Sequence, residues 1–233
     1  NGSALGLKTM VDKDSENYTG SDYFTDNDLR GDWDMSSFSN KITLKQDSAK
    51  ISGNGAYSYD GNVYITKRGY YEIAGELTDG SIIVDAKSNA KVWLKLCGAD
   101  ISCSDDAALI VDQADKVFLT LAEGSENYIS SGEEYSEDAL EDNTSGAIFA
   151  HDDLTINGSG SLTVTGGIKH GIDGNDDIVI AGGTIFISTP RDGIHAKESI
   201  RIREASVTVE AEDDGLVVRA GVGWLRQQAE KGE

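Results

Sequence analysis

The residues of this chain that are best suited to chemistry are aspartates that recur at a nearly constant spacing. Asp152–Asp153 is followed by Asp176–Asp177 after 24 residues, and Glu198 takes the corresponding place after 22 more. If residues at this spacing stack on neighbouring strands, they lie about 4.8 Å apart. Two carboxylates at about 5 Å repel by roughly 3 kcal/mol at an effective dielectric constant near 20, so such a column needs compensation.

A second column is expected at the residue that precedes each repeated glycine. It holds His170, Asp192 and Asp214, and the column beside it holds Lys169, Arg191 and Asp213. The same alignment places Asp173 over His195. These residues extend the acidic region to a second turn of the repeat.

Raised pKa values, basic neighbours or a divalent cation could each relieve the repulsion. The basic residues nearby supply less charge than the acids need, and Ca²⁺ takes about six to eight oxygen ligands in a flexible geometry. We therefore predict Ca²⁺ as the cofactor, with ligands from Asp152, Asp153, Asp173, Asp176, Asp177, Asp192, Asp213 and Asp214. The alternative is a solvated row of acidic turns, since aspartate is favoured in turns for its local hydrogen bonds.

The elements that must position these acids are short strands in a repeat that runs from Lys169 to Leu216. Gly171, Gly193 and Gly215 are each 22 residues apart, and apolar residues alternate with polar ones between them. Alternation at period two indicates half-buried strands. A repeat of this length with several strands is typical of a solenoid, so we predict a parallel β-helix with coils of about 22–25 residues.

The rest of the chain divides around this repeat. Residues 1–36 are interpreted as a tail and cap, 37–218 as the parallel β-helix, and 219–233 as a C-terminal cap or truncated coil. The cap would cover the first coil with Tyr23, Phe24, Leu29 and Trp33. Residues 130–146 form an acidic insertion, for which a solvated loop and a metal-binding loop are equally open.

Composition excludes several classes of partner and site. The formal net charge of −21 argues against nucleic acid and anionic membrane surfaces. No apolar run is long enough to cross a membrane, and the two cysteines are too few for a disulfide framework. The three histidines lie in predicted turns without cysteine partners, so we interpret them as polar turn residues rather than zinc ligands.

Exposed tyrosines could stack on sugar rings, since they offer an apolar face and a hydroxyl tip. Packing is favoured for Tyr64 and Trp93, whereas Tyr70 and Tyr71 are left open with Tyr57 and Tyr59.

An ordered series of phrases resembles the clostridial cell-surface carbohydrate-binding β-helix family. The phrases are SDYFTDNDL, ITKRGYYEIAGELTDGSIIVDA, ADKVFLTLAEGSEN, HDDLTINGSGSLTVTG, KHGIDGNDDIVIAGGTIFI and DGIHAKESI. The resemblance covers about residues 22–218 and implies an all-β, right-handed, single-stranded parallel β-helix of the pectate-lyase-like type. It also implies calcium binding and the binding of cellulose and acidic sugars. Glu198–Ser199 departs from the family's Asp-Asp phrase.

Together these observations favour a non-catalytic module that binds plant cell-wall polysaccharide with the help of Ca²⁺. The expected ligands are acidic sugars such as polygalacturonate in pectin, with cellulose as a further candidate, and the expected binding residues are Lys169, Arg191, Tyr57 and Tyr59. One alternative is a Ca²⁺-dependent polysaccharide lyase, in which Arg191 or Lys169 would remove the proton beside a uronate carboxylate. Another is a structural adhesin or spacer. A secreted or bacterial cell-surface location and a monomeric state are expected.

Overall fold

Apolar residues at every second position decide which side of each strand faces the interior. In β8 (Lys91–Cys103), Val92, Leu94 and Leu96 are buried, while the residues between them are partly exposed. The computed structural model describes residues 5–8, 23–31 and 40–218, within which lie twenty-one strands and one short helix. The chain is therefore all-β in this part, as predicted.

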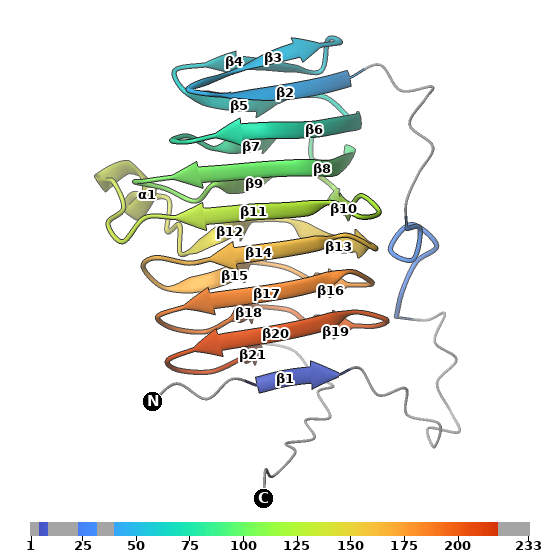
Figure 1. Cartoon of the computed structure of the whole chain (residues 1–233), viewed down its shortest axis with the longest axis vertical. Coiled ribbons are helices and arrows are strands. Elements are labelled where there is room, and N and C mark those ends of the chain that lie inside the picture. Colours follow the sequence, from blue (N-terminus) through green and yellow to red (C-terminus); the bar gives the residue numbers. More distant parts are fainter. Residues whose placement is uncertain (1–4, 9–22, 32–39, 219–233) are drawn as a thin grey trace, which may run out of the picture.

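Thirteen strands form the larger of two sheets (Figure 1). Besides β8 they are β1 (Leu5–Lys8), β2 (Asn40–Gln46), β3 (Ser48–Ser52), β6 (Gly69–Leu77), β10 (Lys116–Leu121), β11 (Glu126–Ser131), β13 (Asp153–Gly158), β14 (Ser161–Thr165), β16 (Ile178–Ile180), β17 (Thr184–Thr189), β19 (Ile200–Ile202) and β20 (Ser206–Ala211). The smaller sheet holds β4 (Ala56–Tyr59), β5 (Asn62–Ile65), β7 (Ile82–Asp85), β9 (Leu109–Gln113), β12 (Gly146–Ala150), β15 (His170–Gly174), β18 (Ile194–Ala196) and β21 (Leu216–Val218). Helix α1 (Glu137–Glu141) lies in the insertion.

The larger sheet is curled because two rows of parallel strands meet at β8. The first part of β8 pairs with β10, and its last residues pair with β11. One row continues through β13, β16 and β19, and the other through β14, β17 and β20. The inward side chains of both sheets belong to one hydrophobic core.

The prediction of a right-handed single-stranded parallel β-helix is wrong. The strands are arranged in a curled thirteen-stranded sheet and a second, eight-stranded mixed sheet. Antiparallel pairs join β1 to β20, β2 to β3 and β4 to β5, and β8 continues unbroken from one row into the other. Periodicity reports which side chains point inward, but it does not report where a strand bends, continues or reverses.

The register predicted from the repeat is confirmed. Ile172 pairs with Ile194, and Ile194 pairs with Leu216, in the parallel strands β15, β18 and β21. Ile148 pairs with Leu109 across the insertion. Equivalent positions of successive repeats therefore do stack as columns, which is the property on which the prediction of the site depended.

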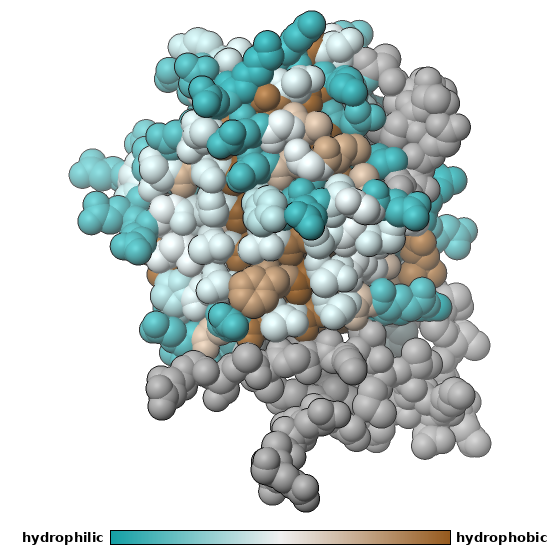
Figure 2. All heavy atoms as spheres, viewed as in Figure 1, coloured by the Kyte–Doolittle hydropathy of each residue, from teal (hydrophilic) through white to brown (hydrophobic). Residues whose placement is uncertain are grey.

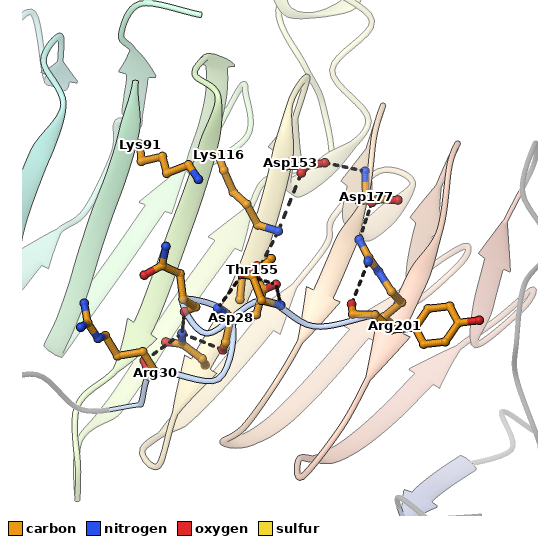
Figure 3. A network of polar contacts seen from close by, with 12 residues as sticks. Asp28, Arg30, Lys91, Lys116, Asp153, Thr155, Asp177 and Arg201 are labelled. Atoms are coloured by element: carbon orange, nitrogen blue, oxygen red, sulfur yellow. Dashed lines mark hydrogen bonds and ion pairs between the residues drawn. The ribbon is translucent and has the colours of Figure 1, made fainter. Parts of the chain in front are cut away.

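The cap prediction required the N-terminal segment 23–31 to cover the first repeat. The segment lies elsewhere. This crossing segment instead contacts side chains of β10, β13 and β19 (Figure 3). Thr155 Oγ1 donates to Asp28 Oδ1 at 2.6 Å, and Lys116 Nζ lies 3.0 Å from the same oxygen. Arg201 donates to the Tyr23 carbonyl at 2.8 Å. Trp33 and residues 219–233, to which the sequence assigned cap roles, fall outside the described residues.

Candidate functional site

The first acidic column lies in the turns that connect the smaller sheet to the β13 and β16 row. Asp153 Oδ2 is 3.7 Å from Lys116 Nζ, and Asp153 Oδ1 accepts from the Asp177 backbone N–H at 3.3 Å. Asp177 forms an ion pair with Arg201 and accepts from Ser199 Oγ at 2.6 Å (Figure 3). Basic residues on neighbouring strands thus compensate this column, a remedy that the sequence pattern underestimated.

Asp152 and Asp176, in the adjacent column, are compensated less well. Asp152 Oδ2 accepts from the Ala114 backbone N–H at 2.8 Å. Burial raises the pKa of Asp176, and the charges of Asp177 and Asp152 raise it further. Among the ion pairs of the described residues, none includes Asp152 or Asp176. These two carboxylates therefore retain oxygen atoms suited to a hard cation.

The second acidic column lies in the turns that precede β15, β18 and β21. Arg191 Nε is 3.2 Å from Asp213 Oδ2, and both side chains are more than half exposed. Asp192 Oδ1 accepts from the Asp214 backbone N–H at 3.3 Å. The Lys169 carbonyl accepts from the Arg191 backbone N–H at 2.9 Å, which fixes one turn over the next.

The structure therefore splits the predicted calcium ligands between two places. One group follows β12 and β15, and the other precedes β18 and β21. A strand such as β15, with five residues at about 3.3 Å per residue, separates the two ends by roughly 15 Å. Asp173 belongs to neither group, because it lies on β15 itself. No single site holds all eight aspartates.

Asp173 instead forms a buried cluster with two histidines that sequence reasoning had interpreted as turn residues. His170 and Asp173 lie on β15 and His195 lies on β18, and only 4–6% of each residue is exposed. Asp173 Oδ1 is 2.5 Å from His195 Nδ1, and Ser145 Oγ donates to the other oxygen of Asp173. The alignment of Asp173 over His195 is confirmed, but periodicity gave no sign of their burial.

Burial lowers the pKa of His170, and the charge of His195 lowers it further, against an opposing effect of Asp173. The His170 and His195 rings stack with centroids 4.8 Å apart. His170 Nδ1 also lies 3.2 Å from Asp192 Oδ2. The cluster thus combines imidazole nitrogens and carboxylate oxygens in a small, buried volume.

The acidic insertion packs against the start of β12, close to this region. Ser136 caps α1, and Tyr135 donates through its hydroxyl to the Gly146 carbonyl at 3.0 Å. Two groups of the described residues bring three ligand atoms within 4.8 Å of one another, and neither includes an acid of the insertion. One group is the histidine cluster, and the other is Asp79, Cys103 and Asp105. In the second group, burial raises the pKa of the Cys103 thiol, which disfavours a thiolate ligand.

The aromatic residues left open by the sequence fall into three environments. Tyr57 and Tyr59 are 50% and 68% exposed on β4, and Tyr57 stacks on Tyr64 with centroids 5.0 Å apart. Tyr70 belongs to a stack with Trp93 and Phe118 across β6, β8 and β10. Tyr71 is fully buried and donates to the Lys67 carbonyl at 2.7 Å, so it is a packing residue.

A further exposed surface, which the sequence analysis did not single out, is the outer face of β11, β14, β17 and β20. It carries rows of hydroxyl side chains, with Tyr128 and Phe186 in the central column of the parallel register. The hydroxyl residues are Ser130, Ser161, Thr163, Thr165, Thr184, Ser188, Ser206 and Thr208. Tyr128 is 44% exposed. In Figure 2 this hydroxyl face is mainly pale, the colour of intermediate hydropathy. Alternation along the strands would have revealed it, since most of the outward positions hold Ser or Thr.

Known proteins share both sequence and fold with this chain. A family model described as carbohydrate-binding domain-containing protein matches residues 59–221. A relative of the same description from Acetivibrio thermocellus is 33% identical over 149 residues, which cover 63% of this chain and 52% of the relative. The chain thus spans about half the length of that curated relative.

Among solved structures, the polysaccharide lyase-like protein from C. thermocellum, as a gadolinium derivative, matches with a TM-score of 0.65 and 26% identity. The match covers 79% of this chain and 96% of that protein. No helix in the described ranges has the length and apolar character needed to cross a bilayer. Since the family model matches more than half of the sequence, this chain belongs to the family of carbohydrate-binding domain-containing proteins.

Proposed function

We propose that this chain is a non-catalytic module that binds plant cell-wall polysaccharide outside the cell, with the help of Ca²⁺. Membership of a carbohydrate-binding family supports the general activity. The observation that carries the proposal is the hydroxyl face, where four parallel strands expose rows of Ser and Thr around Tyr128 and Phe186.

The chemistry of this face suits a polysaccharide chain. Hydroxyl groups both donate and accept hydrogen bonds, as sugar hydroxyls do. Aromatic rings offer an apolar surface to the C–H groups of a pyranose. Residues of one column repeat at the spacing of paired strands, about 4.8 Å, so successive sugars meet similar contacts.

The rim of the face supports recognition of acidic sugars. Lys169 and Arg191 lie in the turns that follow β14 and β17, at one edge of the hydroxyl face. Arg191 is exposed and its Nε engages Asp213, so the rest of its guanidinium could bind a uronate carboxylate. Tyr57 and Tyr59, on the smaller sheet, offer a second aromatic platform.

Calcium is proposed to assist polysaccharide binding because the protein is strongly acidic. A chain with a net charge of −21 repels a polyanion, and a bound divalent cation reduces this repulsion locally. Asp152 and Asp176 are the favoured ligands in the first turn, and Asp214 in the second, because Asp213 is already paired with Arg191. Carboxylates of this kind are the ligands that Ca²⁺ prefers.

The lyase alternative requires a base beside the bound uronate. Arg191 is engaged by Asp213, which favours a role in charge compensation. A lyase would generate an unsaturated sugar with new ultraviolet absorbance, and the binding module would not. The same samples can therefore be assayed for both activities.

The test is affinity electrophoresis in gels that contain polygalacturonate or a soluble cellulose derivative, with CaCl₂ or EDTA. We expect retardation of the wild type, and Ca²⁺-dependence on polygalacturonate. Tyr128→Ala with Phe186→Ala should weaken the affinity by about tenfold or more, given about 0.5–1.5 kcal/mol per aromatic contact. The control is Leu140→Ala, which removes an apolar side chain of similar exposure (47%) from α1.

If Tyr57→Ala with Tyr59→Ala abolishes binding instead, the site lies on the smaller sheet. No retardation of the wild type on any polysaccharide would contradict the proposed function.

A further inference from the structure

The His170, Asp173 and His195 side chains form a group with the composition of a transition-metal site. One ligand atom from each residue lies within 4.8 Å of the other two. Imidazole nitrogens and a carboxylate oxygen are suitable ligands for Zn²⁺, Ni²⁺ or Co²⁺, whereas Ca²⁺ prefers oxygen alone. This donor set therefore differs in chemistry from the acidic turns.

The burial of this group points to a missing partner. His195 Nε2 is buried without a hydrogen-bond partner in the described structure, and the residue is more than nine-tenths buried. A buried polar atom without a partner costs roughly 1–3 kcal/mol. A bound ion would provide the His195 ring with a partner.

The surroundings resemble the outer shell of a metal site. Ser145 Oγ donates to one oxygen of Asp173 and so orients the carboxylate. Asp192 Oδ2 lies 3.2 Å from His170 Nδ1, at the position of the carboxylate that commonly orients a metal-bound histidine. The two carboxylates, Asp173 and Asp192, would also balance the charge of a divalent ion.

The place of the cluster in the fold is compatible with binding. Asp173 and His195 alternate with the core residues Ile172 and Ile194, so they lie on the outer face of the smaller sheet. The ring planes are 13° from parallel. Because metal–nitrogen distances are about 2.0–2.1 Å and each ion lies near the plane of its imidazole ligand, binding of one ion by both residues requires at least one ring to rotate.

We propose that His170, Asp173 and His195 bind one divalent transition-metal ion. The site is separate from the calcium proposal, and it does not depend on carbohydrate binding. It also assigns Asp173 to this ion rather than to Ca²⁺.

The test is calorimetric titration of the protein, without a polyhistidine tag, with ZnSO₄, together with the visible absorption spectrum of the Co²⁺ form. We expect one equivalent of Zn²⁺ to bind in the presence of excess Ca²⁺, and Co²⁺ to give ligand-field bands. His195→Gln and His170→Gln should each weaken Zn²⁺ binding by about 100-fold or more. The matched control is His151→Gln, because His151 is the remaining histidine of the chain and packs edge-on against Phe149 outside the cluster.

Three results would overturn the proposal. The first is absence of Zn²⁺ binding by the wild type at millimolar concentration. The second is equal loss of affinity in the His151 variant, and the third is unchanged affinity in the His195 variant. If the cluster variants fail to fold, crystals of the wild type soaked in ZnSO₄ decide the matter. An anomalous peak between His170, Asp173 and His195 supports the site, and a peak only elsewhere rejects it.

Discussion

At the scale of single residues, the acidic repeats are stabilised by bases placed on neighbouring strands. Lys116 bridges Asp28 and Asp153, and Arg201 bridges Asp177 and the Tyr23 carbonyl. These contacts hold the crossing segment 23–31 against the sheet. The Asp28–Lys116 pair is the more buried of them, with 2% and 10% of the side chains exposed.

Asp28→Asn should therefore destabilise the protein by about 2 kcal/mol at neutral pH, because it breaks a buried, hydrogen-bonded ion pair. Burial raises the pKa of Asp28, but hydrogen bonds from Thr155, the Thr25 backbone and Lys116 outweigh this and hold the pKa below its usual value. A carboxylate with a lowered pKa stabilises the fold above its unfolded pKa, and this contribution is lost as pH falls.

Thermal unfolding at pH 7 and near pH 3 tests this prediction. The difference in Tm between the wild type and Asp28→Asn should be large at pH 7 and should shrink below about pH 4. Asp26→Asn is the control, since Asp26 is exposed in the same segment. An equal effect of both variants would contradict the assigned role.

Asp176→Asn should have the opposite effect on the calcium-free protein. Burial and neighbouring carboxylates raise the pKa of Asp176, so its charged form costs stability as pH rises through that pKa. In EDTA at pH 7 the variant should be at least as stable as the wild type, whereas its increase in Tm on addition of CaCl₂ should be smaller. Differential scanning fluorimetry measures both quantities. Asp47→Asn, at an exposed turn between β2 and β3, should leave both unchanged.

At the scale of elements, tight turns let successive strands stack without gaps. Gly158 ends β13 with φ +97°, and a Cβ at this residue would lie 2.2 Å from the Leu121 carbonyl oxygen. Both the backbone conformation and the close approach of another strand therefore require glycine here.

Gly158→Ala should lower the free energy of unfolding by about 3 kcal/mol or more, from backbone strain together with steric overlap. Gly124→Ala provides a matched control, because Gly124 also has a positive φ (+68°) but nothing lies within 4 Å of its Cβ position. The control should cost only about 1–2 kcal/mol. Urea denaturation compares the two, and equal costs would show that the contact with Leu121 has no effect.

At the scale of the whole molecule, the net charge of −21 opposes compaction of the fold. Salt of any kind should raise Tm by screening, because the Debye length falls to about 10 Å at 0.1 M ionic strength. If the protein has a specific calcium site, the rise in Tm with CaCl₂ should exceed the rise caused by screening. CaCl₂ should raise Tm further than NaCl at matched ionic strength, and MgCl₂ should do less because Mg²⁺ demands a stricter geometry. Identical curves for CaCl₂ and NaCl would indicate screening alone.

The sequence by itself determined the local features of this protein. Alternation identified the strands, and the 22-residue spacing gave the register that pairs Ile172 with Ile194 and Asp173 with His195. These features follow from properties of a few residues at a time, namely the period of a strand and the length of a repeat. The resemblance to carbohydrate-binding proteins rested on the same local phrases.

Only the tertiary structure decided how the strands divide into sheets and which charges meet. The continuous course of β8, the antiparallel end strands and the position of the crossing segment all depend on contacts between distant parts of the chain. Thr155 and Asp28, for example, are 127 residues apart in the sequence. The burial of His170 and His195 likewise depends on the packing of whole elements, because periodicity fixes the side of a strand on which a residue lies and not what covers that side.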